Sequence, residues 1–263
     1  MCTTTPLLQP ILPTPEPPLS SRLSDSSAQF VAWPRTSGLE HSGDPVVIFD
    51  CNGVLVDSEP LATEIVSQEF MRAGFRLTPE IVAHYFTGRR PADMFHDVEI
   101  AAGRKLPAGF AATVASTTLK RFRTELQPTK HVAQALTWLR GPKCVASSSS
   151  HDRIRVSLEC TGLIRFFEPN LFSASETKNG KPAPDLFLHA AAKMGVRPAD
   201  CIVVEDSAVG VAAGVAAGMT AVGFTGGSHV RGRLADHLRA AGARAVISDM
   251  RALKGTIIDL RGW

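Results

Sequence analysis

Carboxylates stand directly after two of the apolar runs in this sequence. Residues 46–49 lead into Asp50, and residues 201–204 lead into Glu205 and Asp206. A short apolar run bounded by turn residues predicts a strand that is buried on both faces of a parallel sheet. Open α/β sheets bind their ligands at the carboxyl ends of such strands. Because these side chains supply hard oxygen ligands, the pattern indicates a site for Mg²⁺.

A hydroxyl and an ammonium group are expected at the same edge of the sheet. Ser147 follows the apolar run at residues 143–146, and Lys181 lies in a loop, residues 181–185, that opens a helix. Right-handed crossover connections bring the ends of parallel strands to one edge. Together with Mg²⁺, these groups could neutralise the charge of a phosphoryl group during its transfer. Asp50 would then be the nucleophile and would form a covalent aspartyl-phosphate.

The remaining elements form a frame that would hold these groups. Expected helices and strands alternate after residue 127, which predicts a doubly wound parallel sheet. We therefore expect an α/β core made of residues 44–59 and 127–263. Its expected elements include a helix at residues 129–139 and strands at residues 170–174, 220–224 and 245–247.

The segment between the first strand and the rest of the sheet has a different character. Residues 60–126 show helical signals and no strand signal. Gly74 ends one helix, and Thr78 with Pro79 is typical of the start of the next. We expect residues 60–126 to form an all-helical cap. Residues 1–43 are rich in proline and serine and are expected to be a disordered tail.

The overall composition is that of a globular protein with a large core. The chain has 263 residues, of which 44% are hydrophobic and 20% are charged. Its formal net charge of +3, with no basic run, argues against nucleic acid as a partner. No apolar stretch is long enough to cross a membrane. The five cysteines show no metal-ligand spacing and are expected to be reduced thiols of a cytoplasmic protein.

Four sequence segments resemble motifs of the haloacid dehalogenase-like superfamily. They are residues 50–59, 146–149, 181–185 and 204–210, and they follow one another in the family's order, with a helical insertion after the first. The chain is most similar to the branch that contains β-phosphoglucomutase, phosphoglycolate phosphatase and sugar-phosphate phosphatases. The resemblance extends from about residue 45 to the end of the sequence. It implies a Rossmann-like core with a helical cap.

The resemblance implies a metal site at the sheet edge. Asp50 would be both the nucleophile and a ligand of Mg²⁺. Asn52 would hold the position of the general acid and base, and its backbone carbonyl would be a second ligand of the metal. Asp206 would be a further ligand, with Glu205 as another ligand or as a partner of the ligands.

The resemblance also implies groups that bind the phosphate. Ser147 would hydrogen-bond the phosphoryl group, and Lys181 would hold both that group and the nucleophile. Ser148 and Ser149 are candidates for additional loop donors. His151 as a catalytic base is the less favoured alternative, because its position suits the start of the next helix.

Two arginines are candidates for binding the rest of the substrate. Arg89 and Arg90 lie in the expected cap. In this branch of the family, a similar cap turn touches the substrate beyond its phosphate, so the two guanidinium groups could recognise a second anionic or polyhydroxyl group. The alternative is that both are solvated charges at a helix end.

One position departs from the family pattern. Phosphatases and mutases of the family usually have aspartate where this chain has Asn52. That carboxyl protonates the leaving group and later activates water, which an amide cannot do at neutral pH. Because general acid–base catalysis contributes roughly 10²–10⁴-fold, Asn52 should slow the turnover of esters with poor leaving groups by about that factor. Metal binding should survive, since the backbone carbonyl is unchanged.

The sequence therefore favours a Mg²⁺-dependent phosphatase that hydrolyses a small phosphate monoester, such as a sugar phosphate, through an aspartyl-phosphate. Two alternatives stay open, namely a phosphosugar mutase and, because of Asn52, a phosphate-ester-binding protein with little turnover. The expected partner is a small phosphorylated metabolite, without nucleic acid or membrane. The sequence determines neither the ester nor the oligomeric state, for which a monomer is the expectation.

Overall fold

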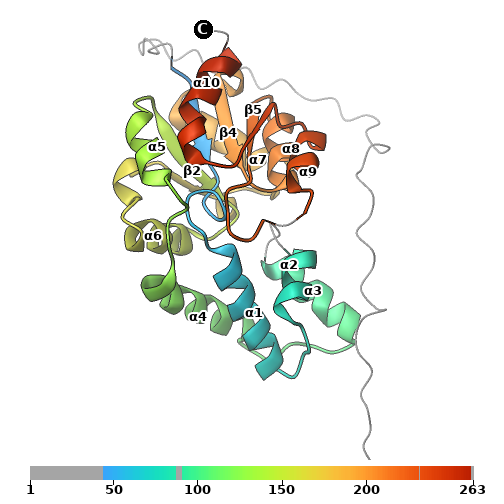
Figure 1. Cartoon of the computed structure of the whole chain (residues 1–263). Coiled ribbons are helices and arrows are strands. Elements are labelled where there is room, and N and C mark those ends of the chain that lie inside the picture. Colours follow the sequence, from blue (N-terminus) through green and yellow to red (C-terminus); the bar gives the residue numbers. More distant parts are fainter. Residues whose placement is uncertain (1–43, 87–90, 231, 262–263) are drawn as a thin grey trace, which may run out of the picture.

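Six strands form a single sheet in the computed structural model, which describes residues 44–86, 91–230 and 232–261. The strands follow the order β3-β2-β1-β4-β5-β6, and all neighbouring pairs are parallel (Figure 1). They are β1 (Val46–Phe49), β2 (Lys143–Ser147), β3 (Leu171–Ser173), β4 (Cys201–Glu205), β5 (Thr220–Phe224) and β6 (Ala245–Ile247). This sheet confirms the expected α/β class.

Helices cover both faces of the sheet, because successive residues of each buried strand point to opposite faces. On one face, Val47 and Phe49 of β1 pack with α5, α6 and α10; on the other face, Val46 and Ile48 pack with α7 and α8. The helices of this part are α5 (Val132–Trp138), α6 (His151–Cys160), α7 (Asp185–Met194), α8 (Ala208–Ala216), α9 (Leu234–Ala240) and α10 (Leu253–Arg261). The doubly wound arrangement is therefore confirmed.

A group of four helices is inserted between β1 and β2 and lies beyond the carboxyl ends of the strands (Figure 1). The group has a core of its own, in which the ring of Phe70 contacts the rings of Phe75, Phe95 and Phe110 at centroid distances of 4.9–6.1 Å. Its members are α1 (Glu59–Arg72), α2 (Pro79–Phe86), α3 (Pro91–Ala102) and α4 (Phe110–Glu125). The expected helical insertion is thus present, while the exact domain limits stay a prediction.

β1 stands at the point where the strand order reverses. Phe49 is level with Val145 of β2 on one side and with Val204 of β4 on the other. The backbone N–H of Asp50 donates to the carbonyl of Val204 at 3.0 Å, which ties the residue after β1 to β4. Such a reversal opens a crevice outside the carboxyl ends of the strands, where open α/β sheets bind ligands.

The helix expected at residues 129–139 is shorter than predicted, because α5 begins only at Val132. The side chain of Thr129 donates to the carbonyl of Val54 at 2.5 Å, so this residue is bonded to the loop after β1. His131 has a φ of 63°, in the left-handed region, and helical geometry cannot continue through it. Both constraints come from tertiary structure.

Candidate active site

A buried lysine joins two carboxylates at the carboxyl edge of the sheet. The ammonium group of Lys181 donates to Oδ1 of Asp50 at 2.6 Å, and it also donates to Oε1 of Glu205. The other oxygen of Glu205 accepts hydrogen bonds from the backbone N–H and the hydroxyl of Ser207, at 3.3 and 2.9 Å. Both Lys181 and Glu205 are therefore held in one position, and the ammonium group is fixed beside Asp50.

The electrostatics of this site are dominated by burial and by negative charge. Burial raises the pKa of the Asp50 carboxyl to about 8; Lys181 opposes this shift, and the nearby Glu205 and Asp206 add to it. Burial alone would lower the pKa of Lys181, but its two carboxylate partners raise it above its ordinary value. Lys181 therefore stays protonated beside Asp50.

Two glycines make room for the carboxylates. A Cβ atom on Gly53 would lie 1.8 Å from Oδ2 of Asp206, and Gly53 also has a φ of 71°, which favours glycine. A Cβ atom on Gly210 would lie 2.0 Å from the carboxyl carbon of Glu205. The backbone thus approaches both acidic side chains more closely than any other residue type would allow.

The residues at this edge fit a divalent cation of the kind that takes oxygen ligands. Asp50 and Asp206 both line the pocket described below, and their mutual repulsion is part of the raised pKa of Asp50. Among the described residues, no three His, Cys, Asp or Glu side chains form a group that could hold a metal ion by themselves. That donor set suits Mg²⁺, which is usually bound by one or two carboxylates and completed by water and substrate phosphate.

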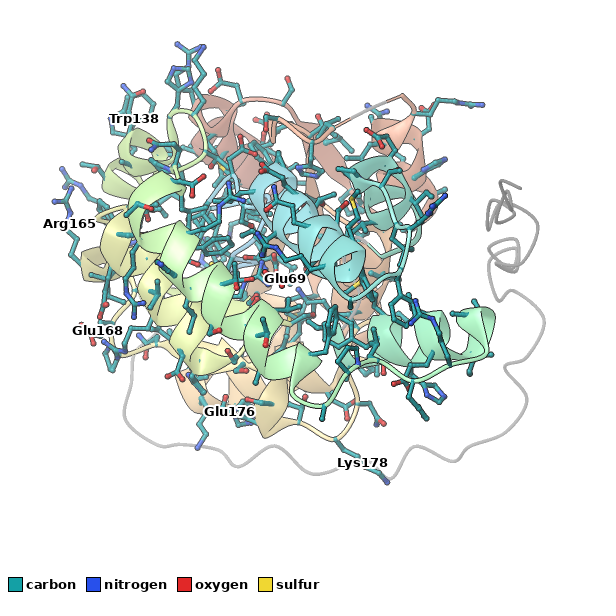
Figure 2. The ribbon with its side chains drawn as sticks, turned by 90° about the horizontal axis from the view of Figure 1, so that it is seen from below. Glu69, Trp138, Arg165, Glu168, Glu176 and Lys178 are labelled. Carbon is teal, nitrogen blue, oxygen red and sulfur yellow. The ribbon has the colours of Figure 1, made fainter. Side chains whose placement is uncertain are left out.

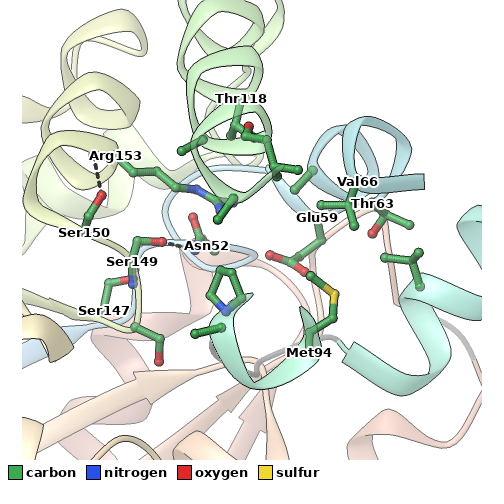
Figure 3. A pocket seen from close by; sticks show the side chains of 18 of the residues that line it. Asn52, Glu59, Thr63, Val66, Met94, Thr118, Ser147, Ser149, Ser150 and Arg153 are labelled. Atoms are coloured by element: carbon green, nitrogen blue, oxygen red, sulfur yellow. Dashed lines mark hydrogen bonds between the residues drawn. The ribbon is translucent and has the colours of Figure 1, made fainter. Parts of the chain in front are cut away.

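The side chain of Asn52 is held by two hydroxyl groups. Its Nδ2 donates to Oγ of Ser149 at 2.9 Å (Figure 3). Its Oδ1 accepts from Oγ of Ser58 at 3.1 Å. A carboxylate could accept hydrogen bonds from both hydroxyls in the same place, because each can turn its proton towards it. The geometry at position 52 is therefore compatible with aspartate as well as with asparagine.

A pocket of about 450 Å³ lies between the sheet edge and the inserted helices (Figure 3). Its sheet-edge side is polar, whereas α1, α3 and α4 contribute mainly apolar side chains. The candidate residues that line it are Asp50, Asn52, Ser147, Ser148, Ser149, Lys181 and Asp206. The structure thus brings seven of the candidates together around one cavity.

The remaining candidates have other places. Glu205 does not line the pocket and accepts a hydrogen bond from Lys181. Arg89 and Arg90 fall outside the described residues. His151 is exposed, pairs with Glu176 at 2.7 Å and does not line the pocket. Ser150 caps α6 by accepting from the backbone N–H of Arg153.

Three residues near the site were not identified from the sequence. Glu59 and Arg153 line the pocket, and Nε2 of His229 lies 3.2 Å from Oδ2 of Asp206. Burial would lower the pKa of His229, but Asp206 raises it above its ordinary value. Glu59 closes the first motif, so its acidic side chain was a usable signal. His229 lies 23 residues after Asp206 in sequence, and no local pattern connects the two.

Comparison with known proteins identifies the family. A family model for haloacid dehalogenase-like hydrolases matches residues 45–218. The chain is a haloacid dehalogenase-like hydrolase. This hydrolase is 32% identical over 184 residues to a 6-phosphogluconate phosphatase of Escherichia coli, covering 70% of this chain and 83% of the relative. It is 29% identical over 179 residues to a fructose-1-phosphate phosphatase of the same organism, covering 67% of this chain and 94% of the relative.

A solved structure agrees with this assignment. A haloacid dehalogenase-like protein of unknown function from Agrobacterium tumefaciens superimposes with a TM-score of 0.73 and 37% identity, over 83% of this hydrolase and 99% of that chain. The expected superfamily is therefore confirmed. The expected enzyme class, hydrolases of phosphoric monoesters, agrees with the phosphatases among the relatives. None of the helices in the described ranges is long and apolar enough to span a membrane.

Proposed function

We propose that this hydrolase releases phosphate from a small phosphorylated sugar or sugar derivative, with Asp50 as the nucleophile. The observation that carries the proposal is the buried pair of Asp50 and Lys181 at the floor of a pocket large enough for such a molecule. Ser147, buried at the end of β2, lines the same floor. The names of the two Escherichia coli relatives support a phosphorylated sugar or sugar acid as the substrate.

In the first step, a carboxylate oxygen of Asp50 attacks phosphorus and forms a P–O bond while the ester P–O bond breaks. Lys181 holds Oδ1, and Oδ2 accepts no hydrogen bond from the described residues, so Oδ2 is the oxygen available for attack. The ammonium group of Lys181 and the hydroxyl of Ser147 stabilise the charge on the phosphoryl oxygens. The leaving alkoxide must take a proton from solvent water, because the amide of Asn52 cannot supply one.

In the second step, water attacks the aspartyl-phosphate, phosphate leaves, and the carboxylate of Asp50 is restored. The attacking water must lose a proton to bulk solvent, because Asn52 cannot accept it. We therefore place the slow step for activated esters here, with a loss of roughly 10²–10⁴-fold relative to an aspartate at position 52. Asp50, Asp206 and the backbone carbonyl of Asn52 would hold Mg²⁺. When bound, that ion would neutralise phosphate charge and favour the ionised form of Asp50.

The proposal is tested by assaying phosphate release from a panel of phosphorylated sugars, sugar acids and polyols. Wild-type protein with Mg²⁺ should release phosphate from at least one ester, and chelation of the metal should stop the reaction. Asp50→Asn should abolish release, because an amide does not attack phosphorus. Release by Asp50→Asn above a few per cent of the wild-type rate would remove Asp50 from this role. Tight ester binding without release, even in Asn52→Asp, would favour the binding-protein alternative.

A further inference from the structure

The side chain of Arg153 lies on the pocket wall, and its guanidinium group binds no acceptor among the described residues. Arg153 lies in the first turn of α6, and its side chain points into the pocket (Figure 3). Its Nε atom is buried without a hydrogen-bond partner, and none of the described residues accepts a hydrogen bond from the guanidinium. A buried polar group left without a partner destabilises the folded protein, and a charged group does so more strongly. The guanidinium group of Arg153 is therefore placed to bind a ligand that enters the pocket.

Neighbouring contacts fix Arg153 without using its donors. The guanidinium carbon lies 4.9 Å from the ring centroid of Phe122 in α4, in a cation–π contact. The backbone N–H of Arg153 is bonded to the hydroxyl of Ser150, which sets the start of α6. Burial lowers the pKa of Arg153 and Glu59 opposes this shift, so the group keeps its charge. Arg153 is therefore a charged hydrogen-bond donor that is held in one position on the pocket wall.

Glu59 provides a matching acceptor on the other side of the pocket. Its side chain points inward from the first residue of α1, towards Arg153 (Figure 3). No ion pair joins the two residues within 4.0 Å, and Glu59 accepts no hydrogen bond from the described part of the chain. Burial raises the pKa of Glu59, with a smaller contribution from Asp206. The pocket thus offers a cationic donor and a separate acceptor above the floor where Asp50 lies.

We propose that Arg153 determines specificity by binding a carboxylate of the substrate, and that the substrate is a phosphorylated polyhydroxy acid. This inference rests on the proposed function. The planar guanidinium matches a carboxylate through two parallel hydrogen bonds. Glu59 accepts hydrogen bonds from the hydroxyl groups of the same molecule. A polyol phosphate of equal length has a neutral end and leaves the charge of Arg153 unbalanced, so it is a poorer substrate.

Two esters with the same carbon chain test the inference. In 6-phosphogluconate the end opposite the phosphate is a carboxylate, and in glucitol 6-phosphate it is a hydroxymethyl group. Wild-type protein should prefer the acid. Arg153→Gln should lower kcat/KM for the acid by roughly 10²-fold and should change kcat/KM for the polyol and for acetyl phosphate by less than about threefold. The matched control is Arg155→Gln, at an exposed arginine of the same helix that pairs with Glu159 and Glu168; it should change none of the three.

Several outcomes would overturn the inference. Equal losses on all three substrates would show that Arg153 acts on the phosphate or on the packing of α4 against α6. A wild-type protein without preference for the acid would show that no carboxylate is recognised. If Arg153→Gln does not fold, Arg153→Lys keeps the charge but loses the two parallel hydrogen bonds, and an equal effect on acid and polyol would overturn the proposal.

Calorimetry separates this inference from the proposed function. If no ester is hydrolysed, the proposed function fails, and binding of 6-phosphogluconate to wild-type protein and to Arg153→Gln is then compared directly. Binding that is about 10²-fold weaker in the variant would support Arg153 as the carboxylate site. Unchanged or absent binding would overturn it.

Discussion

The sheet-edge wall of the pocket is polar, and its side chains hydrogen-bond to one another, whereas the wall formed by α1, α3 and α4 is mainly apolar. On the sheet-edge wall, Lys181 joins Asp50 to Glu205, and Glu205 is held in turn by Ser207. Each of these groups has a fixed partner. A change at one of them should therefore disturb the site for every substrate.

The helical wall presents side chains such as Val66, Phe95 and Val114, which offer shape but no directional bonds. These residues belong to or adjoin the separate core of the inserted helices. A change there should affect only substrates that are large enough to reach the wall. We therefore propose that, apart from Arg153 of α6 and Glu59 of α1, the sheet-edge wall serves the chemical step and the helical wall serves the choice of substrate. The following predictions test that separation.

The largest effect is expected for Lys181→Met, on the sheet-edge wall. The variant loses the cation beside the transferred phosphoryl group, so kcat/KM should fall by roughly 10²–10³-fold for acetyl phosphate and for larger esters alike. The control is Lys178→Met, three residues earlier, because the side chain of Lys178 is exposed and points away from the protein (Figure 2). Circular dichroism must show that both variants are folded. A loss confined to large esters would contradict the proposed division between the walls.

A smaller effect is expected for Gly210→Ala, which leaves every functional group in place. The added Cβ atom would collide with the carboxyl group of Glu205 and displace it, together with Lys181. We expect a loss of about 1–3 kcal/mol in the free energy of unfolding and a fall in turnover of roughly 10²-fold.

The control for this variant is Gly255→Ala in α10, where a Cβ atom would have no neighbour within 4 Å. Because Gly255 is an exposed helical residue, this change should stabilise the protein by roughly 0.5–1 kcal/mol, measured by urea unfolding. Equal free energies of unfolding for Gly210→Ala and Gly255→Ala would show that Glu205 can be displaced without a loss of stability.

The smallest effect is expected for Ala115→Leu, on the helical wall. Ala115 lines the pocket, so a leucine there would occupy space needed by a six-carbon ester and should raise its KM roughly tenfold. The KM for acetyl phosphate should not change. Ala112→Leu, in the same helix but outside the pocket, should affect neither substrate. An equal rise for both substrates in Ala115→Leu would mean that the helical wall also acts on the phosphate.

The residues of the sheet-edge wall could be predicted because each follows a local signal. Asp50, Ser147 and Asp206 come directly after apolar runs, and parallel strands bring such ends together whatever the details of packing. The strand at residues 170–174 and the helix that begins after Lys181 were also expected from the sequence. The local sequence was therefore sufficient to predict those side chains whose position depends only on the direction of a strand.

The features that sequence did not predict depend on contacts between distant segments. Arg153 faces the pocket because α6 packs beside Phe122 of α4, and the direction of that side chain has no local signature. The two hydrogen bonds of Asn52 join Ser58 to Ser149, 91 residues apart in the chain, so they too follow from the folded structure. The late start of α5 has the same origin, since Thr129 is bonded to the loop after β1.

We propose that Asp50 forms a phospho-enzyme whose hydrolysis is slow because Asn52 cannot act as a base. Mixing wild-type protein with an aryl phosphate and Mg²⁺ tests it, because an aryl leaving group departs without a proton. We expect a burst of phenolate release, about one per protein molecule, followed by a slow steady rate of release. Phosphate should remain trapped on Asp50. In Asn52→Asp, whose side chain can keep both hydroxyl partners, the burst should disappear and the steady rate should rise by roughly 10²-fold or more.

Asn52 is followed by Gly53, a pair prone to spontaneous deamidation, so peptide mass analysis must confirm that the wild-type sample still contains the amide. A wild-type protein without a burst or trapped phosphate, and a steady rate unchanged in Asn52→Asp, would show that the reaction does not pass through the limiting step proposed here.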